Sequence, residues 1–117
     1  MSGKKVLVVE DHDDTRRALV SLLGRLGYQV VEAATVAQGI ASVDGQAVAI
    51  LDLNLPDGVG TEVLKHIRSQ NHHTKVVCVT ASADPGMLKE LAALGPDAVF
   101  KKPVDVAQLL NWIGEPT

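Results

Sequence analysis

Residues 50–64, ILDLNLPDGVGTEVL, are the part of the chain that decides its fold. They begin inside an apolar run, AVAIL over residues 47–51, which ends at an acidic residue, Asp52. The PDG sequence at 56–58 is typical of a tight turn. The residues after the turn have apolar side chains at helical spacing. The pattern therefore predicts a buried strand, a turn and a helix, with Asp52 at the carboxyl end of the strand.

Short apolar runs alternate with helical patterns along the rest of the chain. The other runs are VLVV at 6–9, VVEA at 30–33, KVVCVT at 75–80 and AVF at 98–100. Because most of these runs are apolar on consecutive residues, they predict parallel strands that are covered on both faces. A segment with helical spacing follows each run, as at Leu19, Leu22, Leu23 and Leu26. We therefore predict an α/β fold, a (βα)5 three-layer sandwich around a five-stranded parallel sheet.

Length and composition exclude several classes of protein. The chain has 117 residues, of which 46% are hydrophobic and 21% charged, as in an ordinary globular domain. Aromatic residues are only 3% and the net charge is −3, so neither a base-stacking platform nor a general affinity for nucleic acid or anionic lipid is expected. The single cysteine, Cys78, cannot form an intrachain disulfide, and it lies in an apolar run where we expect it to be buried.

The chain also lacks the sequence features of a secreted or membrane-inserted protein. No apolar stretch approaches the roughly 18 residues of a transmembrane helix, and the first run is interrupted at once by acidic residues. We therefore expect a cytoplasmic domain over residues 4–115, with no effector domain in this chain, no membrane insertion and no direct contact with nucleic acid.

Polar residues follow four of the five predicted strands, where ligands bind in open α/β sheets. These residues are Glu10 and Asp11 after the first strand, Asp52 after the third, Thr80 at the end of the fourth, and Lys101 and Lys102 after the fifth. Three clustered carboxylates repel one another, so at least one pKa should rise in the absence of a cation. Oxygen ligands of this kind suit Mg²⁺ better than Zn²⁺, and a lysine opposite the metal would stabilise a bound phosphate.

Four motifs make the chain resemble a response-regulator receiver domain, the phosphoacceptor module of two-component signalling. They are VLVVED at 6–11, ILDLNLPDGVGTEVL at 50–64, VTAS at 79–82 and KKPVD at 101–105. Each motif is weak alone, but their order and their positions at strand ends are specific in combination. The resemblance covers essentially the full length and implies a flavodoxin-like fold with strand order 2-1-3-4-5.

The resemblance implies a role for each acidic residue. Asp52 matches the nucleophile that takes a phosphoryl group from a phosphohistidine on a sensor histidine kinase or a histidine phosphotransfer domain. Asp11 matches the direct Mg²⁺ ligand, and Glu10 the member of the acidic pair that acts through water. The backbone carbonyl of Asn54 would complete the protein ligands. Such a domain is a regulatory phosphoacceptor that catalyses only its own phosphotransfer and dephosphorylation.

The resemblance also assigns the remaining polar residues. Lys102, immediately before a proline, matches the lysine that contacts the phosphoryl oxygens, and Thr80 the hydroxyl that moves onto them. Strand alternation sends Lys101 to the opposite side, so we expect it to be solvated. Phosphorylation would then re-pack the surface of the fourth helix, fifth strand and fifth helix. Many receivers have an aromatic residue three positions before the lysine, whereas this chain has Val99 there, with Phe100 one position later.

Three other functions fit the sequence less well. A haloacid-dehalogenase-type phosphatase needs a second aspartate two residues after the nucleophile and places the nucleophile on the first strand, whereas this chain has Asn54 and a third-strand aspartate. A flavin mononucleotide carrier needs a loop rich in Gly, Ser or Thr, which EDHDD at 10–14 does not provide. An interaction module that is never phosphorylated would not need the complete set of predicted phosphoacceptor residues, which are Glu10, Asp11, Asp52, Thr80 and Lys102.

The sequence leaves open whether the domain acts alone or within a hybrid kinase or longer regulator, and which kinase and output it serves.

Overall fold

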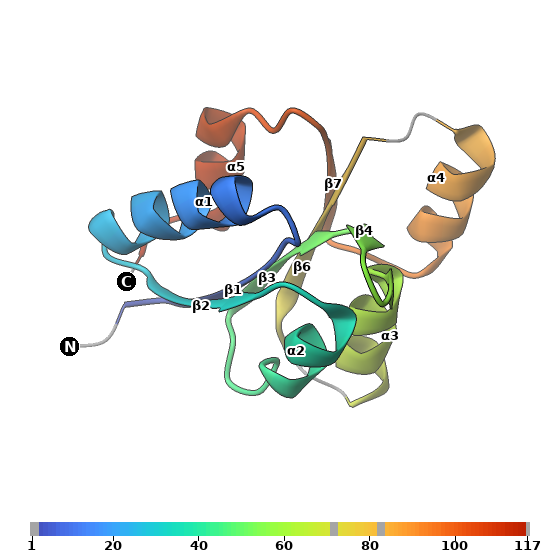
Figure 1. Ribbon diagram of the computed structural model, residues 1–117, viewed down its shortest axis with the longest axis horizontal. Coiled ribbons are helices and arrows are strands. Elements are labelled where there is room, and N and C mark those ends of the chain that lie inside the picture. Colours follow the sequence, from blue (N-terminus) through green and yellow to red (C-terminus); the bar gives the residue numbers. More distant parts are fainter. Residues whose placement is uncertain (1–2, 71–72, 82–83, 117) are drawn as a thin grey trace.

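A parallel sheet with helices on both faces forms the molecule in the computed structural model, which describes residues 3–70, 73–81 and 84–116 (Figure 1). Along the sheet the strands are β2 (Gln29–Ala33), β1 (Lys5–Val9), β3 (Val48–Asp52), β6 (Lys75–Thr80) and β7 (Ala98–Lys101). All neighbouring strands of this sheet are parallel. Since β6 and β7 are the fourth and fifth predicted strands, the predicted order 2-1-3-4-5 is confirmed.

The helices cover the two faces of the sheet unequally. They are α1 (Asp13–Arg25), α2 (Val36–Ala41), α3 (Thr61–Ser69), α4 (Pro85–Ala93) and α5 (Val106–Ile113). Figure 1 shows α1 and α5 over one face and α2 and α3 over the other, with α4 beyond α3.

Polar side chains begin several of the helices, because their oxygens accept hydrogen bonds from backbone amides that have no partner within the helix. Thr35 accepts from the amide of Gln38, and Asp105 from the amide of Gln108. None of the described helices is long and apolar enough to cross a membrane.

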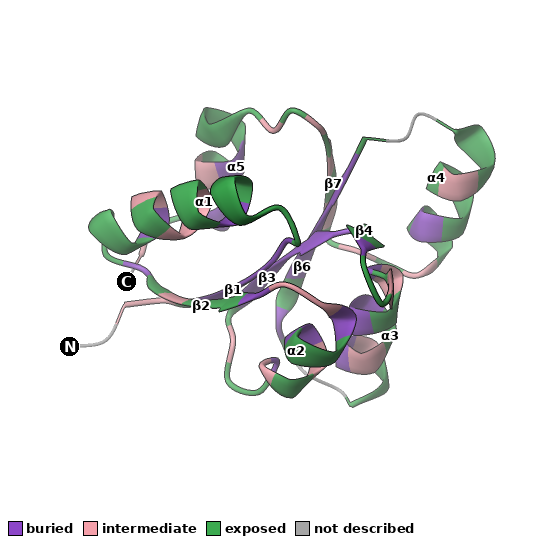
Figure 2. Cartoon of the chain, in the orientation of Figure 1, coloured by how far each residue is buried: buried purple, intermediate pink, exposed green. Residues whose placement is uncertain are grey.

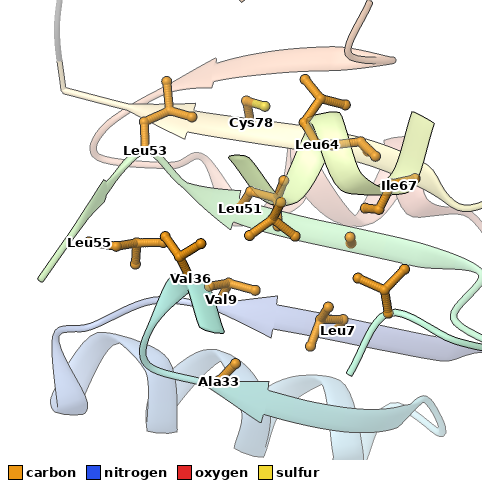
Figure 3. Packing of buried hydrophobic residues seen from close by; sticks show 14 of the residues in the cluster. Leu7, Val9, Ala33, Val36, Leu51, Leu53, Leu55, Leu64, Ile67 and Cys78 are labelled. Atoms are coloured by element: carbon orange, nitrogen blue, oxygen red, sulfur yellow. The ribbon is translucent and has the colours of Figure 1, made fainter. Parts of the chain in front are cut away.

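Two hydrophobic clusters hold these layers together, one on each face of the sheet. On the α1 and α5 face, Val8 and Ile50 of the central strands pack with Leu23 and Leu109 of the helices. On the other face, Leu7 and Leu51 pack with residues of α2 and α3 (Figure 3). Cys78 belongs to this second cluster and is fully buried, as predicted. Burial raises the pKa of its thiol to about 12, so the side chain is a neutral part of the core.

The strands differ in how completely they are covered. All five residues of β3 are buried, and β1 and β6 are buried except at their first residues, as predicted for strands covered on both faces (Figure 2). For β2 and β7 that prediction is wrong, because both strands lie at the edges of the sheet, where the helices leave side chains uncovered. Val31 of β2 is 41% exposed and Val99 of β7 is 42% exposed.

A small hairpin follows β3 and shapes the loop beyond Asp52. It consists of β4 (Asn54–Leu55) and β5 (Gly58–Val59), which pair antiparallel around the turn predicted at 56–58. The chain then returns to the end of β3, where the amide of Gly60 donates to the carbonyl of Leu53 at 2.9 Å. A Cβ at Gly60 would lie 2.1 Å from the carbonyl oxygen of Asp52. Glycine is therefore required here so that the backbone can pack this closely against the acidic residue.

Candidate functional site

The predicted site residues meet at one edge of the sheet, beyond the carboxyl ends of its strands. Asp52 and Thr80 are the last residues of β3 and β6, and they are 4% and 1% exposed. Glu10 follows β1 directly and is 6% exposed, whereas Asp11 beside it is exposed. Lys102 follows β7, and its backbone amide donates to the carbonyl of Thr80 at 2.9 Å. The parallel sheet thus brings together residues that are up to 92 positions apart in the chain.

Three carboxylates form a cluster that could hold a divalent cation. Glu10, Asp11 and Asp52 each offer one carboxylate oxygen, and these oxygens all lie within 4.8 Å of one another. The donor set contains oxygen alone, which is the set that Mg²⁺ prefers. Two of the three acids are buried and the third is open to solvent, so an ion could enter from the side of Asp11. The residues present therefore fit the predicted metal.

Lys102 lies against the buried side of this cluster. Its Nζ is 3.1 Å from Oδ2 of Asp52 and 3.4 Å from Oε1 of Glu10. Burial favours the neutral amine, but the hydrogen bond and charge of Asp52, together with Glu10, outweigh it and raise the pKa of Lys102. The side chain is therefore a fixed positive charge beside the predicted acceptor. The neighbouring Lys101 is exposed, as predicted.

The environment of the acidic cluster raises the pKa of Glu10. Burial, followed by the hydrogen bond to Asp52 and the charge of Asp52, raises the pKa of Glu10 to about 7. Lys102 and the backbone amide of His12, which donates to Oε2 at 3.4 Å, act in the opposite direction and do not cancel the rise. In the absence of a cation the folded protein therefore holds a proton on Glu10 at pH values where an exposed glutamate is ionised.

We expect Glu10→Gln to stabilise the metal-free protein at high pH. Below pH 4.5 the carboxyl is protonated in both the folded and the unfolded chain, so the substitution changes little. Between pH 4.5 and about 7 the unfolded chain loses the proton that the folded protein keeps, and the native glutamate loses relative stability as the pH rises. Above pH 7 the variant should be more stable by on the order of 2 kcal/mol, after allowance for solvent screening.

Denaturant unfolding of both proteins in a chelator, at a series of pH values, measures this difference. Glu90→Gln removes an exposed carboxylate from α4 and is the control for a change of surface charge. A free-energy difference between native and Glu10→Gln protein that is the same at pH 4 and pH 8 would contradict the assignment.

The backbone of the hairpin contacts the carboxylate of Asp52 from the other side. The amide of Asn54 donates to Oδ1 of Asp52 at 3.3 Å, while Lys102 occupies Oδ2. Each carboxylate oxygen of Asp52 thus has a partner that donates a hydrogen bond or carries a positive charge. The side chain of Asn54 is exposed, and only its backbone amide takes part in this contact. That the carbonyl of Asn54 binds metal stays a prediction. Ser82 of the VTAS motif lies outside the described residues.

Three further residues at this edge were not assigned from the sequence. Arg16 of α1 is buried and donates to the backbone carbonyl of Glu10 at 3.0 Å. His12 is the N-cap of α1, since its Nδ1 accepts from the amide of Thr15. Asp57 of the hairpin turn accepts hydrogen bonds from the amides of Val36 and Ala37, which begin α2. The spacing of three between Asp13 and Arg16 is typical of an ion pair within a helix. Histidine is not among the residues preferred as an N-cap, and the sequence gives no signal for the contact of Arg16 with a backbone carbonyl or for the contacts of Asp57 with the distant start of α2.

Comparison with known proteins identifies the family. The model of the response regulator receiver domain matches residues 6–114. Sporulation initiation phosphotransferase F of Bacillus subtilis is 29% identical over 115 residues, which are 97% of this chain and 93% of that protein. A cyclic di-GMP phosphodiesterase of Thermotoga maritima is 36% identical over 104 residues, which are 89% of this chain but only 28% of that protein.

A solved structure agrees with this result. The crystal structure of a CheY-like response regulator receiver domain protein from Methanospirillum hungatei superposes with a TM-score of 0.86 at 31% identity and covers 96% of this chain and 91% of that one. The acidic cluster, the neighbouring lysine and the strand order are those that the sequence motifs led us to expect. The chain belongs to the response regulator receiver domain family.

Proposed function

We propose that this receiver domain accepts a phosphoryl group on Asp52 from a phosphohistidine of a sensor histidine kinase or histidine phosphotransfer domain. One observation carries the proposal: the amine of Lys102 lies 3.1 Å from the carboxylate of Asp52, which belongs to an acidic cluster suited to a cation. A structural ion pair would not need two further carboxylates beside it, because their mutual repulsion destabilises the fold.

The proposed reaction is an attack by a carboxylate oxygen of Asp52 on the phosphorus of the donor. A P–O bond forms as the P–N bond of the phosphoimidazole breaks, and the imidazole leaves with the bonding electrons and takes up a proton. The product is an acyl phosphate on Asp52. Because Asn54 and Lys102 bond to different oxygens of Asp52, the carboxylate is oriented before the donor arrives.

We propose that Asp11, Asp52 and the carbonyl of Asn54 bind Mg²⁺, with Glu10 acting through a water molecule. When bound, the cation offsets the charge that gathers on the phosphoryl oxygens. Lys102 would contact those oxygens from the opposite side, and its raised pKa keeps it charged for that contact. Thr80, at the end of the neighbouring strand, would supply a hydroxyl to the same group.

A cavity beside the acceptor gives the donor a place to approach. It has a volume of about 810 Å³ and is lined at one end by Glu10, Asp52 and Lys102. The rest of its wall is mainly apolar and comes from α1, from the central strands of the sheet, and from α5 and the segment that leads into it. We propose that the partner that carries the phosphohistidine covers this opening, which would exclude water from the transfer.

We propose that phosphorylation changes the surface formed by α4, β7 and α5. A phosphoryl group adds about −1.5 to −2 charge and new acceptor oxygens, which would attract Thr80 and Lys102. Thr80 ends β6 just before the connection to α4, so its movement would reach that helix. Val99 is 42% exposed on β7, whereas Phe100 packs on the opposite face against the α1 and α5 cluster. The response would therefore not use an aromatic side chain at position 99.

We also propose that the unit is regulatory, spans residues 4–115 and acts in the cytoplasm. On this proposal its phosphotransfer chemistry serves only its own acceptor.

Incubation with acetyl phosphate and Mg²⁺ tests the function without a cognate kinase. We expect the intact mass to rise by one phosphoryl group, because the acceptor site itself supplies the positioning and the charge compensation. An excess of chelator should slow the reaction by roughly a hundredfold or more, since metal ions contribute several kcal/mol to such transfers. No incorporation with metal present, or equal incorporation with and without chelator, would contradict the proposal.

A further inference from the structure

Arg16 joins three segments at the back of the acidic cluster. It lies in α1, which runs over β1 and β2 (Figure 1), and its side chain is 9% exposed. Its Nη1 donates to the backbone carbonyl of Glu10 at 3.0 Å. Its Nε donates to Glu32 of β2 at 2.9 Å, and its Nη2 to Asp13 at 2.6 Å. The planar guanidinium is suited to this task because its donors are fixed relative to one another.

The contact with Glu10 fixes the peptide that leads into Asp11. A peptide group is planar, so the carbonyl of Glu10 and the amide of Asp11 turn together. On the other side of the same residue, the amide of Glu10 donates to the carbonyl of Ala33 at 3.0 Å. The backbone of Glu10 is therefore held by β2 through one group and by Arg16 through the other. The direction in which the chain leaves Glu10 places Asp11 at the cluster.

The charge of Arg16 is balanced by its own partners. Asp13 and Glu32 each form an ion pair with it, so two negative charges surround one positive charge. Removal of Arg16 would leave this region more negative, and charge alone would then strengthen the binding of a cation nearby. Loss of the contact to Glu10 would have the opposite effect, because the loop that presents the carboxylates would lose its support. The two explanations predict opposite signs.

We propose that Arg16 is a positioning residue for the metal site, which holds the loop between β1 and α1 so that Glu10 and Asp11 face the cation together. This inference rests on the proposed function, since it assumes that the acidic cluster binds Mg²⁺. Partners that orient the ligands of a metal without touching it are typically worth 10-fold to 100-fold in affinity. We expect Arg16→Met to weaken Mg²⁺ binding by about tenfold, although it removes a positive charge.

Metal titration of the purified chain tests this inference directly. Binding of Mn²⁺ is measured from the electron paramagnetic resonance signal of the free ion, and Mg²⁺ affinity by competition. The titrations are carried out well below the melting temperature of each variant, as determined by circular dichroism. Arg17→Met is the matched control, because it removes the same charge from the adjacent, exposed position of the same helix. Its Mg²⁺ affinity should equal that of the native chain or be slightly higher.

Two further variants show whether weaker Mg²⁺ binding comes from the lost contact, from misfolding or from a misplaced cation site. Arg16→Lys keeps the charge and the aliphatic stem but cannot span three acceptors, so it should also bind Mg²⁺ several-fold more weakly, and it decides the case if Arg16→Met does not fold. Native or tighter affinity in a folded Arg16 variant would overturn the inference. Asp11→Ala separates this failure from that of the proposed function: if that variant still binds Mg²⁺ like the native chain, the cation site itself is misplaced.

Discussion

Asp52→Asn should abolish the incorporation of phosphoryl groups from acetyl phosphate completely. The amide keeps the size and shape of the carboxylate, but it has a single oxygen, so it can accept from only one of the two donors that contact Asp52, the amide of Asn54 and the amine of Lys102. It is not a nucleophile for phosphorus, so no acyl phosphate can form. The substitution also removes a charge that raises the pKa of Glu10, and this relief of repulsion offsets part of the lost contact, so we expect the metal-free variant to stay folded. Loss of reaction in a folded variant would then be a chemical effect.

Asp57→Asn provides a matched control for this result. It makes the same chemical change five positions later in the same loop, at a carboxylate that accepts from the amides of Val36 and Ala37. Those hydrogen bonds, that of Val36 first, lower the pKa of Asp57 and occupy its oxygens at the start of α2. The control should still gain one phosphoryl group by intact mass. Incorporation into Asp52→Asn at the native rate, or reduction with borohydride that marks a different acid as the acceptor, would contradict the assignment.

The sequence predicted the central part of the fold better than its edges. Continuous apolar runs identify strands whatever their place in the sheet, but burial depends on the neighbouring layers, which a run of side chains does not encode. Val31 and Val99 have the sequence environment of buried strands and are nevertheless exposed, because β2 and β7 are the outermost strands. The same reasoning applies to Leu88, which has helical spacing in α4 but is 36% exposed.

The candidate site was predictable to the extent that it consists of residues at strand ends. Glu10, Asp52 and Lys102 meet because parallel strands end at one edge, so their proximity follows from the order of the motifs. The contact of Arg16 with the carbonyl of Glu10 could not be predicted in this way. It depends on the angle at which α1 crosses the sheet. Because every residue has a backbone carbonyl, the sequence does not indicate which carbonyl accepts the hydrogen bond.

Lys102→Met should slow phosphorylation by roughly a hundredfold to a thousandfold, the usual effect of removing one group that stabilises the charge of a transition state. The same substitution should strengthen Mg²⁺ binding at pH 8, because it removes a positive charge that lies 3.1 Å from Asp52 and 3.4 Å from Glu10. The two effects have opposite signs, which a general loss of structure cannot produce. Intact-mass time courses with acetyl phosphate measure the first effect, and metal titration measures the second.

Lys101→Met is the control that makes this prediction specific to one of two adjacent lysines. Lys101 is exposed at the end of β7, in register with Thr80, and it should tolerate the change with little effect on either measurement. Because both variants lose one positive charge, the long-range field changes similarly, and only the contact with the acceptor differs. Equal rates in the two variants would mean that the ion pair of Lys102 is a structural contact. A larger loss in Lys101→Met would reverse the assignment of the two lysines.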